Sequence, residues 1–542
     1  MSKFLLYYHT LKYLKFTQIY YRIRQRFYTP KISLKVMDPK LSERKASNVC
    51  FIYKDKVYFH DHDEAGFLNH RVNIAARTIW NSKAQEKLWL YNLHYFDALN
   101  AADVKQREEA LSLLYRWVRE NPPTSGCGWA PYPSALRIVN IIKYQLSGGC
   151  LNAEIYRSLY IQARYLAKNC EYHLLGNHLF ENLKALCFAG LFFTGKEADR
   201  WFKKGFNGLL KQVETQLLAD GGHFELSPMY HGIILEGLLD LQSLFAMYRR
   251  SDLFPWQNAI QNMLNWLWHM MRSERAISRF NDAADGISPE PRQLFDYAAH
   301  FGYPTGQKST LITQLAKSGY IVVAYDRVKA ILDIAKVGPD YLPGHAHADT
   351  LSFELMIDNF PVFVNLGTSC YGLSERRLFE RSTKAHNTVV LNEQNSSEVW
   401  AGFRVARRAA AKLINLSDNQ KNEALIEAAH DGYTRFKKDL IHCRQWHFDK
   451  TKLTMTDRIN GTKKAYGYLH LHPHCKVVQR RQQEIMVLLQ NGRRIKLSTA
   501  NRHLIIKNEY APSFGLLQMT RTIRYEFGGD KRNLAQITID WS

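Results

Sequence analysis

The fold of this chain of 542 residues is decided by residues 343–367, PGHAHADTLSFELMIDNFPVFVNLG. Within it, residues 351–367 are two strand-like apolar runs on either side of Asp358 and Asn359, a turn-forming pair. Two such runs joined by two residues of this type are typical of a β-hairpin. The segment therefore predicts that this part of the chain forms a β-sheet.

The first half of the same segment carries His345, His347 and Asp349 at alternate positions. Alternate side chains of a strand point to one face, and His and Asp are common metal ligands. The competing interpretation is a solvated edge strand that binds nothing. The residues by themselves leave both interpretations open.

The strand pattern continues toward the C-terminus. Short segments rich in apolar and aromatic residues alternate with turn signals, which is typical of an antiparallel β-sandwich. Besides the hairpin, these segments are residues 319–335, 388–394, 439–449, 452–461, 466–473 and 534–541.

Earlier in the chain the pattern is helical, with apolar residues at steps of three and four and joints rich in Gly and Pro. Many helices of similar length predict stacked helical hairpins in an (α/α) toroid, and no fixed-period repeat supports a regular solenoid. The clearest helical stretches are residues 138–146, 179–193, 234–248 and 259–271.

We therefore expect an α+β multidomain protein with three parts. They are a basic-aromatic N-terminal segment (1–79), an α/α toroid (80–305) and an antiparallel β-sandwich (306–542).

The charge is strongly positive, because 73 Lys and Arg residues outnumber 50 Asp and Glu residues and leave a net charge of +23. Such a field attracts polyanions. No zinc finger, recognition helix or RNA-binding motif accompanies it, so we expect an acidic partner other than nucleic acid.

The first 30 residues are basic and aromatic, and Lys12, Lys15 and Arg22 interrupt each apolar run. We therefore expect no signal peptide but an amphipathic helix, which packs on the protein itself or lies on a membrane surface. No apolar run is long enough to span a bilayer. These features favour a protein that is cytoplasmic or peripheral to the inner membrane.

Two helix joints gather polar and titratable residues. GNHLFEN places Asn177, His178 and Glu181 at a helix start, where such residues either cap the helix or serve a site. DGGHFELSPMYHG carries Tyr230 and His231 behind two glycines that allow a sharp turn. Loops this rich in titratable groups suggest a catalytic or binding role.

A further segment, WAPYPSALRIVN, holds Trp129 and Arg137. An Arg among aromatic residues suits a sugar that carries a carboxylate. The alternative is an ordinary packed helix.

Taken in order, GNHLFEN, DGGHFELSPMYH, GHAHADTLSFEL, VNLGT and AHNTVV resemble the heparinase II/III group of polysaccharide lyases over residues 80–480. Each motif is unspecific alone, whereas the ordered set is specific. The resemblance implies an α/α toroid, an antiparallel β-sandwich and a substrate cleft between them. It also implies β-elimination, in which a uronic acid loses its C5 proton and the bond to O4 breaks without water.

The resemblance implies roles for the residues that match the motifs. Asn177, with His178 close by, looks like the group that neutralises the uronate carboxylate, while Tyr230 and His345 look like the residues that transfer protons. Contacts with the substrate are expected from Glu181, Arg137, His231 and Trp129.

The resemblance also implies a structural metal, zinc, at His347, Asn365 and His386. Metal-binding members have an Asp where this chain has Asn365. An Asn oxygen is a weaker, neutral ligand, so the sequence departs from the pattern at this position.

The sequence thus predicts a lyase for a uronate-containing, acidic polysaccharide, within exopolysaccharide or capsule metabolism. One alternative is a non-catalytic glycan-binding protein on the same scaffold. Another is an α/α-toroid glycoside hydrolase, which needs two carboxylates that face each other across the cleft; Glu181, Glu225 and Asp282 are loose candidates. The sequence does not indicate an oligomeric state.

Overall fold

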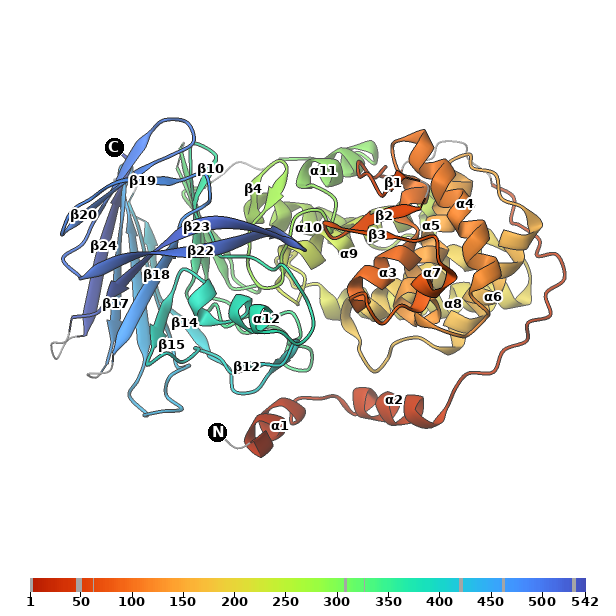
Figure 1. Ribbon diagram of the computed structural model, residues 1–542, viewed down its shortest axis with the longest axis horizontal. Helices are drawn as coiled ribbons and strands as arrows, with labels where there is room; N and C mark the ends of the chain where they lie inside the picture. The colour runs from red at the N-terminus through yellow and green to blue at the C-terminus, as the bar shows by residue number, and fades with distance from the viewer. Residues whose placement is uncertain are drawn as a thin grey trace.

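The computed structural model consists of a helical body and a β body that meet end to end, with the first two helices along one side (Figure 1). This arrangement confirms the predicted fold class. The structure describes residues 3–44, 51–61, 63–306, 310–325, 327–418, 423–460, 464–528 and 533–542.

The helical body is a set of antiparallel hairpins whose inner and outer helices differ in composition. The inner helices α7 and α9 are apolar on nearly every side and are buried, whereas α6 and α8 keep charged faces in solvent. The helices are α3 (Lys87–Tyr95), α4 (Val104–Glu120), α5 (Pro131–Leu146), α6 (Ala153–Lys168), α7 (Gly176–Phe192), α8 (Lys196–Gln216), α9 (Pro228–Met247), α10 (Gln257–Met270) and α11 (Pro291–His300).

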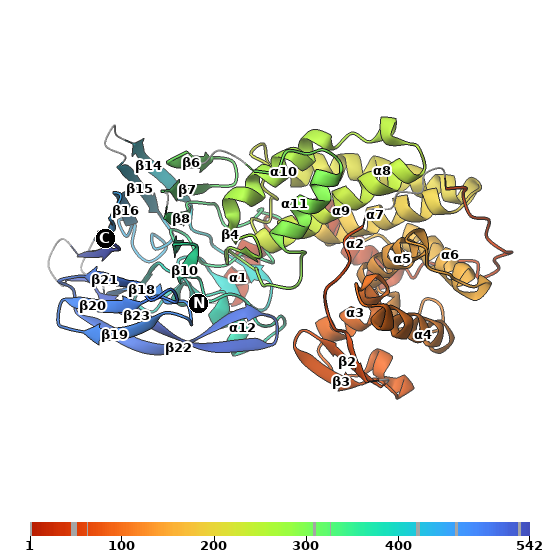
Figure 2. The same cartoon turned by 90° about the horizontal axis from the view of Figure 1, so that it is seen from above.

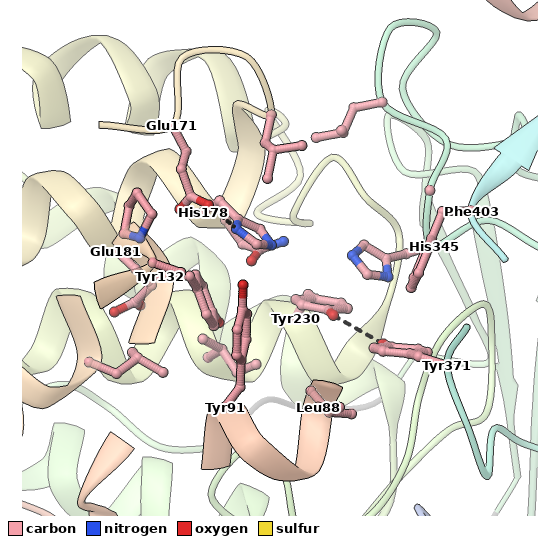
Figure 3. A pocket seen from close by; sticks show the side chains of 18 of the residues that line it. Leu88, Tyr91, Tyr132, Glu171, His178, Glu181, Tyr230, His345, Tyr371 and Phe403 are labelled. Carbon is pink, nitrogen blue, oxygen red and sulfur yellow. Dashed lines mark hydrogen bonds and ion pairs between the residues drawn. The ribbon is translucent and has the colours of Figure 1, made fainter. Parts of the chain in front are cut away.

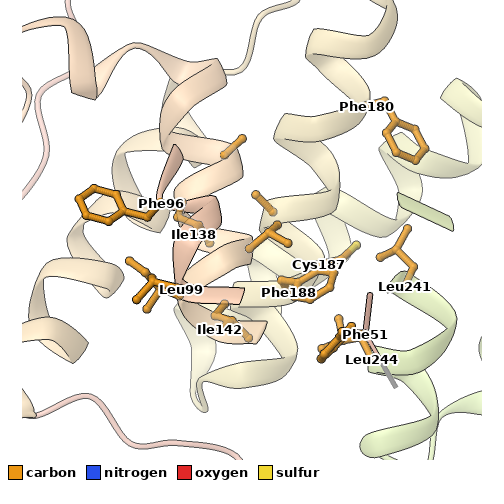
Figure 4. Packing of buried hydrophobic residues seen from close by; sticks show 14 of the residues in the cluster. Phe51, Phe96, Leu99, Ile138, Ile142, Phe180, Cys187, Phe188, Leu241 and Leu244 are labelled. Atoms are coloured by element: carbon orange, nitrogen blue, oxygen red, sulfur yellow. The ribbon is translucent and has the colours of Figure 1, made fainter. Parts of the chain in front are cut away.

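The core of this body lies where α5, α7 and α9 meet (Figure 4). Removing these side chains from water is the main source of stability for such a core. Its members include Ile138, Ile142, Cys187, Phe188, Leu241 and Leu244, with Phe51 added from the N-terminal segment.

The β body is built from three antiparallel sheets that enclose a second core around Trp446. The five-stranded sheet contains β10 (Phe360–Phe363), β9 (Phe353–Ile357), β8 (Val328–Asp333), β7 (Tyr320–Ala324) and β6 (Ile312–Leu315). The eight-stranded sheet contains β14 (Ala411–Asp418), β15 (Ala424–His430), β16 (His442–Phe448), β17 (Lys452–Ile459), β24 (Leu534–Asp540), β21 (Arg494–Ser498), β20 (Glu484–Leu488) and β19 (Lys476–Arg480). The four-stranded sheet contains β11 (Val389–Leu391), β18 (Ala465–His470), β23 (Leu516–Glu526) and β22 (His503–Ser513).

Small elements complete the fold. Helix α12 (Glu375–Glu380) lies in the β body. The short strand pairs are β4 (Met271–Ser273) with β5 (Ala276–Ile277), and β12 (Val399–Trp400) with β13 (Arg404–Val405).

The predicted hairpin is present as β9 and β10. Its turn residues Asp358 and Asn359 have φ angles of 53° and 64°, the left-handed conformation that a two-residue hairpin turn requires. The preceding residues 343–350 form a loop rather than a strand. His345 and His347 therefore stand in the loop that enters the hairpin, as expected for a functional loop, and not in a solvated edge strand.

The N-terminal segment contains two helices, α1 (Lys3–Leu11) and α2 (Phe16–Phe27), where the sequence pattern predicts one. A small sheet of β1 (Phe59–Asp61), β2 (Glu64–Phe67) and β3 (His70–Asn73) follows. Within the described ranges, no helix is both long and apolar enough to cross a membrane.

Candidate active site

A cavity of about 1130 Å³ lies where α1, α2, the helical body and the β body meet. Its walls include His178 and Tyr230 of the helical body and His345 of the β body (Figure 3), and Asn177 lines it as well. Figure 2 shows the two bodies from above, with the junction between them.

Tyr230 and His345 face each other in this cavity. Ser227 caps α9 by accepting a hydrogen bond from the Tyr230 backbone N–H at 3.2 Å, which fixes Tyr230 in the first turn. The rings of Tyr230 and His345 lie 4.1 Å apart, and the hydroxyl of Tyr230 is 3.0 Å from that of Tyr371. Burial, together with Tyr371, raises the pKa of Tyr230 well above its ordinary value. Tyr230 is therefore a neutral phenol in the unliganded protein.

Asp282 fixes the orientation of His345. One carboxylate oxygen lies 2.8 Å from Nδ1 of His345, and the other lies 2.8 Å from Nε2 of His347. Burial alone would raise the pKa of Asp282, but Arg377 and the two imidazoles outweigh it and hold the pKa well below its ordinary value. A carboxylate at Nδ1 favours the tautomer with its proton there, so Nε2 of neutral His345 is free to accept a proton.

Asn177 and His178 lie in the first turn of α7. Asn177 donates a hydrogen bond from Nδ2 to Glu225 at 3.2 Å, and Glu225 also lies 3.7 Å from Nε2 of His345. Gly176 precedes them with φ +54°, and a Cβ there would come within 2.7 Å of Glu225. The glycine thus permits both the turn and the close approach of Glu225.

His178 lies on the cavity wall beside the carboxylate of Glu171. Its Nδ1 lies 3.3 Å from the buried Glu171, and its ring packs at a tilt against that of Tyr132, with ring centroids 4.3 Å apart. Burial alone would lower the pKa of His178, but the ion pair with Glu171 outweighs it and raises the pKa above 6.5. A cation and an amide N–H therefore meet at one end of the cavity.

Glu181 also lines the cavity, but its carboxylate is bound to Lys184 at 2.7 Å. The walls as a whole carry equal numbers of acidic and basic side chains, so the net charge of the chain is not concentrated here. The basic ones are Arg22, Lys54, Lys56, Lys87, Lys143, Lys184 and Arg404, and the acidic ones are Glu86, Asp97, Glu171, Glu181, Glu236, Asp240 and Asp340.

Three predicted substrate contacts are corrected by the structure. Arg137 is fully buried, bonds Gln162 at 2.8 Å and lies 3.8 Å from the ring of Trp117. Trp129 packs against the same Trp117 at 5.9 Å. His231 is buried against Trp266, and its Nε2 lies 3.0 Å from the Met263 carbonyl. All three stabilise the helical body instead of lining the cavity, because their helix faces turn inward.

The residues of the predicted zinc site lie together but do not fit a closed zinc site. Nδ1 of His347 is 3.3 Å from Nε2 of His386. Asn365 turns its oxygen to the backbone N–H of Asn387 at 3.2 Å and leaves its buried NH₂ group without a partner. An N–H donor cannot ligate a cation, and the described residues contain no cluster of three or more His, Cys, Asp or Glu side chains that could hold a metal.

The β body contains a second cluster of the same kind. His430 lies 3.1 Å from His442, which contacts Asp457 at 2.8 Å, and Arg444 neutralises that carboxylate at 2.7 Å. Paired imidazoles that end on a carboxylate therefore occur twice as hydrogen-bonded scaffold. The zinc at His347 stays a prediction, and no step of the mechanism uses it.

Several residues of the site were not identified from the sequence. Tyr371, Tyr132 and Glu171 contribute a hydroxyl, a ring against His178 and a counter-ion; Tyr132 belongs to the aromatic segment WAPYPSALRIVN, whereas Tyr371 and Glu171 stand in no recognisable pattern. Asp282 was considered only as a hydrolase carboxylate. Its Asn-Asp context is a turn signal, and only the fold brings it to His345.

The fold and site define a two-domain protein with a cleft between its domains. The cleft holds Tyr230, His345 fixed by a carboxylate, and His178 beside its counter-ion. Models of known families match nearly the whole chain: "Heparinase II/III N-terminus" over residues 15–305 and "Heparinase II/III-like, C-terminal" over residues 307–540. The chain belongs to the heparinase II/III family.

Individual relatives are distant. A heparin-sulfate lyase of Bacteroides stercoris is 23% identical over 88% of this chain and 77% of its own length. A heparin-sulfate lyase of Pedobacter heparinus is 25% identical over 62% of this chain and 56% of its own length. The crystal structure of heparinase III matches with a TM-score of 0.66 at 19% identity, over 96% of this chain and 88% of that chain.

Proposed function

We propose that this protein is a polysaccharide lyase that cleaves a uronate-containing, acidic polysaccharide by β-elimination. The observation that carries the proposal is the meeting of Asn177, His178, Tyr230 and His345 around one cavity. The family and its heparin-sulfate lyase members support the reaction and an acidic glycan.

Elimination begins with the acidity of the C5 proton. A free carboxylate at C5 opposes its removal, because a second negative charge develops beside the first. The imidazolium of His178 and the second N–H of the Asn177 amide offset this charge. Glu171 keeps His178 protonated, since it raises the pKa of that imidazole.

The two proton transfers then fall to His345 and Tyr230. Nε2 of His345 carries the free lone pair and takes the C5 proton, while Glu225 at 3.7 Å stabilises the imidazolium that forms. Tyr230 is a phenol with a raised pKa and donates its proton to the leaving O4. Tyr371 replaces part of the hydrogen bonding that the phenolate then needs.

The glycoside hydrolase is less well supported. It needs a pair of carboxyl groups with a water between them. Glu181 is bound to Lys184, and Asp282 accepts from His345, His347 and Arg377. A glycan-binding protein would need the cleft, but not the Asp282–His345 pair or the buried hydroxyl of Tyr230.

Elimination is tested by its product. It leaves a double bond conjugated to the carboxylate, which absorbs in the ultraviolet, whereas hydrolysis does not. We expect absorbance to rise when the protein is incubated with at least one of heparan sulfate, chondroitin sulfate, hyaluronan or alginate. New reducing ends without absorbance would indicate hydrolysis, and binding without either product would indicate a glycan-binding protein.

We also propose that the outer side of α1 and α2 contacts an anionic membrane surface, which agrees with a cytoplasmic or inner-membrane-associated location. Residues 1–37 contain eight Lys or Arg and no Asp or Glu. Phe16 and Phe27 are 80% and 85% exposed, and such residues enter the lipid interface. Sedimentation with vesicles that contain phosphatidylglycerol should occur and be lost in a Phe16→Ser/Phe27→Ser variant. Equal sedimentation of both proteins would contradict the contact.

A further inference from the structure

Helices α1 and α2, which we call the strap, run along the side of the molecule past both bodies (Figure 1). Helix α1 contacts the β body, where Trp400 donates a hydrogen bond to Thr10 at 3.1 Å and meets the ring of Tyr7 edge to face, with ring centroids 5.0 Å apart. Helix α2 contacts the helical body, where Tyr21 stacks on Tyr172 at 4.9 Å. The strap thus bridges the two bodies that form the cleft.

The strap is amphipathic in the opposite sense to most surface helices. A helix on a protein surface normally buries its apolar face, but Gln18 is the one buried residue of α2, and α1 buries none. Phe16, Tyr20, Ile23 and Phe27 face outward and are between 51% and 85% exposed. The face of α2 toward the cavity is polar, with Gln18, Arg22 and Gln25, while α1 and the joint after it add Tyr7, Leu11 and Leu14 to the wall.

Two of these polar residues anchor the helix on opposite sides of the site. Gln18 donates a hydrogen bond to the Tyr341 carbonyl at 3.2 Å, in the loop that continues to His345. Gln25 bonds Nδ1 of His173 at 2.9 Å, in the loop that leads to His178. Arg22 stands between the two anchors on the same helix face. It therefore lies over the cleft, between the side that holds Tyr230 and His345 and the side that holds His178.

Arg22 differs from the buried cations of the cavity. Lys54, Lys143 and Lys184 each hold a carboxylate within 3.0 Å. Arg22 makes no hydrogen bond or ion pair with any residue the structure describes, and its guanidinium is close enough to contribute to the lowered pKa of His173, which is due first to burial. A polar helix face that is anchored by Gln18 and Gln25, with an unpaired guanidinium between them, fits a ligand with acidic groups.

We propose that the strap is the outer wall of the glycan-binding cleft and that Arg22 binds a carboxylate or sulfate group of the bound glycan. The identity of the ligand rests on the proposed function, while the binding role of the strap does not require catalysis. Arg22 lies near the reacting sugar, so it selects acidic substitution on that sugar or its neighbour.

The test compares Arg22→Ala with Arg26→Ala, which removes the same charge from the same helix at a position outside the cavity. Both are made in the Tyr230→Phe background, so that the probe is not consumed. Binding of a fluorescent heparan sulfate oligosaccharide is measured by anisotropy. We expect Arg22→Ala to weaken binding about tenfold at low salt and Arg26→Ala to change it by about twofold at most.

Two further measurements sharpen the result. Arg22→Lys should recover part of the affinity, since it keeps the charge but not the paired N–H geometry. The difference between Arg22→Ala and its parent should shrink as salt rises. In the active enzyme, Arg22→Ala should raise KM and leave kcat within about twofold, because it alters binding and not proton transfer.

Equal affinities of Arg22→Ala and Arg26→Ala would overturn the proposal, as would a loss in kcat with KM unchanged. Binding that depends on Arg22 without any unsaturated product from the active enzyme would uphold the strap and overturn the lyase. If Arg22→Ala still catalysed elimination with a normal KM, the lyase would be upheld and the role of the strap would be overturned.

Discussion

Replacing Asp282 with Asn would separate the two tasks that this carboxylate performs. It holds His345 at 2.8 Å in the tautomer that leaves Nε2 free, and it neutralises Arg377, whose side chain is fully buried. An Asn retains the size but loses the charge, and its NH₂ group can donate to Nδ1 of His345. The imidazole would then carry its proton on Nε2, where it cannot act as a base.

The expected magnitudes follow from these contacts. Loss of the base should lower kcat by about 10²- to 10⁴-fold, the usual contribution of a positioned acid or base. An unpaired buried Arg377 should cost about 3–5 kcal/mol of the free energy of unfolding. For a β body of this size, that corresponds to an apparent melting temperature lower by about 6–20 °C.

Asp457→Asn is the matched control. Asp457 is as buried as Asp282 and accepts from His442, Arg444 and Tyr525 at 2.7–2.9 Å, but its partner His442, unlike His345, does not line the cavity. We expect a similar loss in melting temperature and a kcat within about twofold of the original, since no proton transfer depends on His442. Initial rates by ultraviolet absorbance, at a temperature where circular dichroism shows both variants folded, provide the comparison. If both variants lost kcat equally, the effect would be general loosening of the β body and the assignment of Asp282 would be wrong.

Three further predictions concern separate parts of the molecule. Tyr230→Phe should lower kcat by about 10²-fold or more with little change in glycan binding, because it removes the proton donor. Initial rates of ultraviolet absorbance measure this, and a near-normal rate would exclude Tyr230 from proton transfer. Elemental analysis of protein purified without chelator should find less than one zinc per chain, because the Asn365 oxygen is already bound to the Asn387 backbone N–H; stoichiometric zinc that disappears in His347→Ala would restore the metal site. Burial lowers the pKa of His94 from 6.5 to about 3, so as the pH falls the unfolded chain binds a proton at this residue before the folded chain does. The free energy of unfolding should therefore fall by about 1.4 kcal/mol for each pH unit below 6.5 until the pH reaches the folded pKa. Urea titrations of His94→Gln should show a flatter pH dependence of this free energy, and an unchanged slope would contradict the prediction.

Much of the fold follows from local sequence. The apolar periodicity of residues 179–193 and 234–248 predicts helices that the structure shows as α7 and α9. Asp358 and Asn359 predict the β9–β10 turn, because few other residue pairs adopt the left-handed conformation it requires. These features depend on neighbours within a few residues, so the sequence is sufficient to predict them.

The order of the motifs was also sufficient for the family and for the approximate location of the site. Tyr230, His345, Asn177 and His178 do line one cavity. Arg137, Trp129 and His231 show the limit of this reasoning, because a polar or aromatic residue on a helix is equally suited to a hydrogen bond in the core. Which way the helix face turns depends on the packing of other helices.

Other features were decided by the tertiary structure alone. Asp282 joins His345, His347 and Arg377, although 63 to 95 positions separate them in sequence. Helix α2 turns Gln18 and Gln25 toward the cavity, where they bond Tyr341 and His173 in two loops far apart in sequence, whereas the amphipathic pattern alone would place that polar face in solvent. Hydrogen-bond partners and exposed faces are set by which distant segments meet, and no short-range pattern encodes that choice.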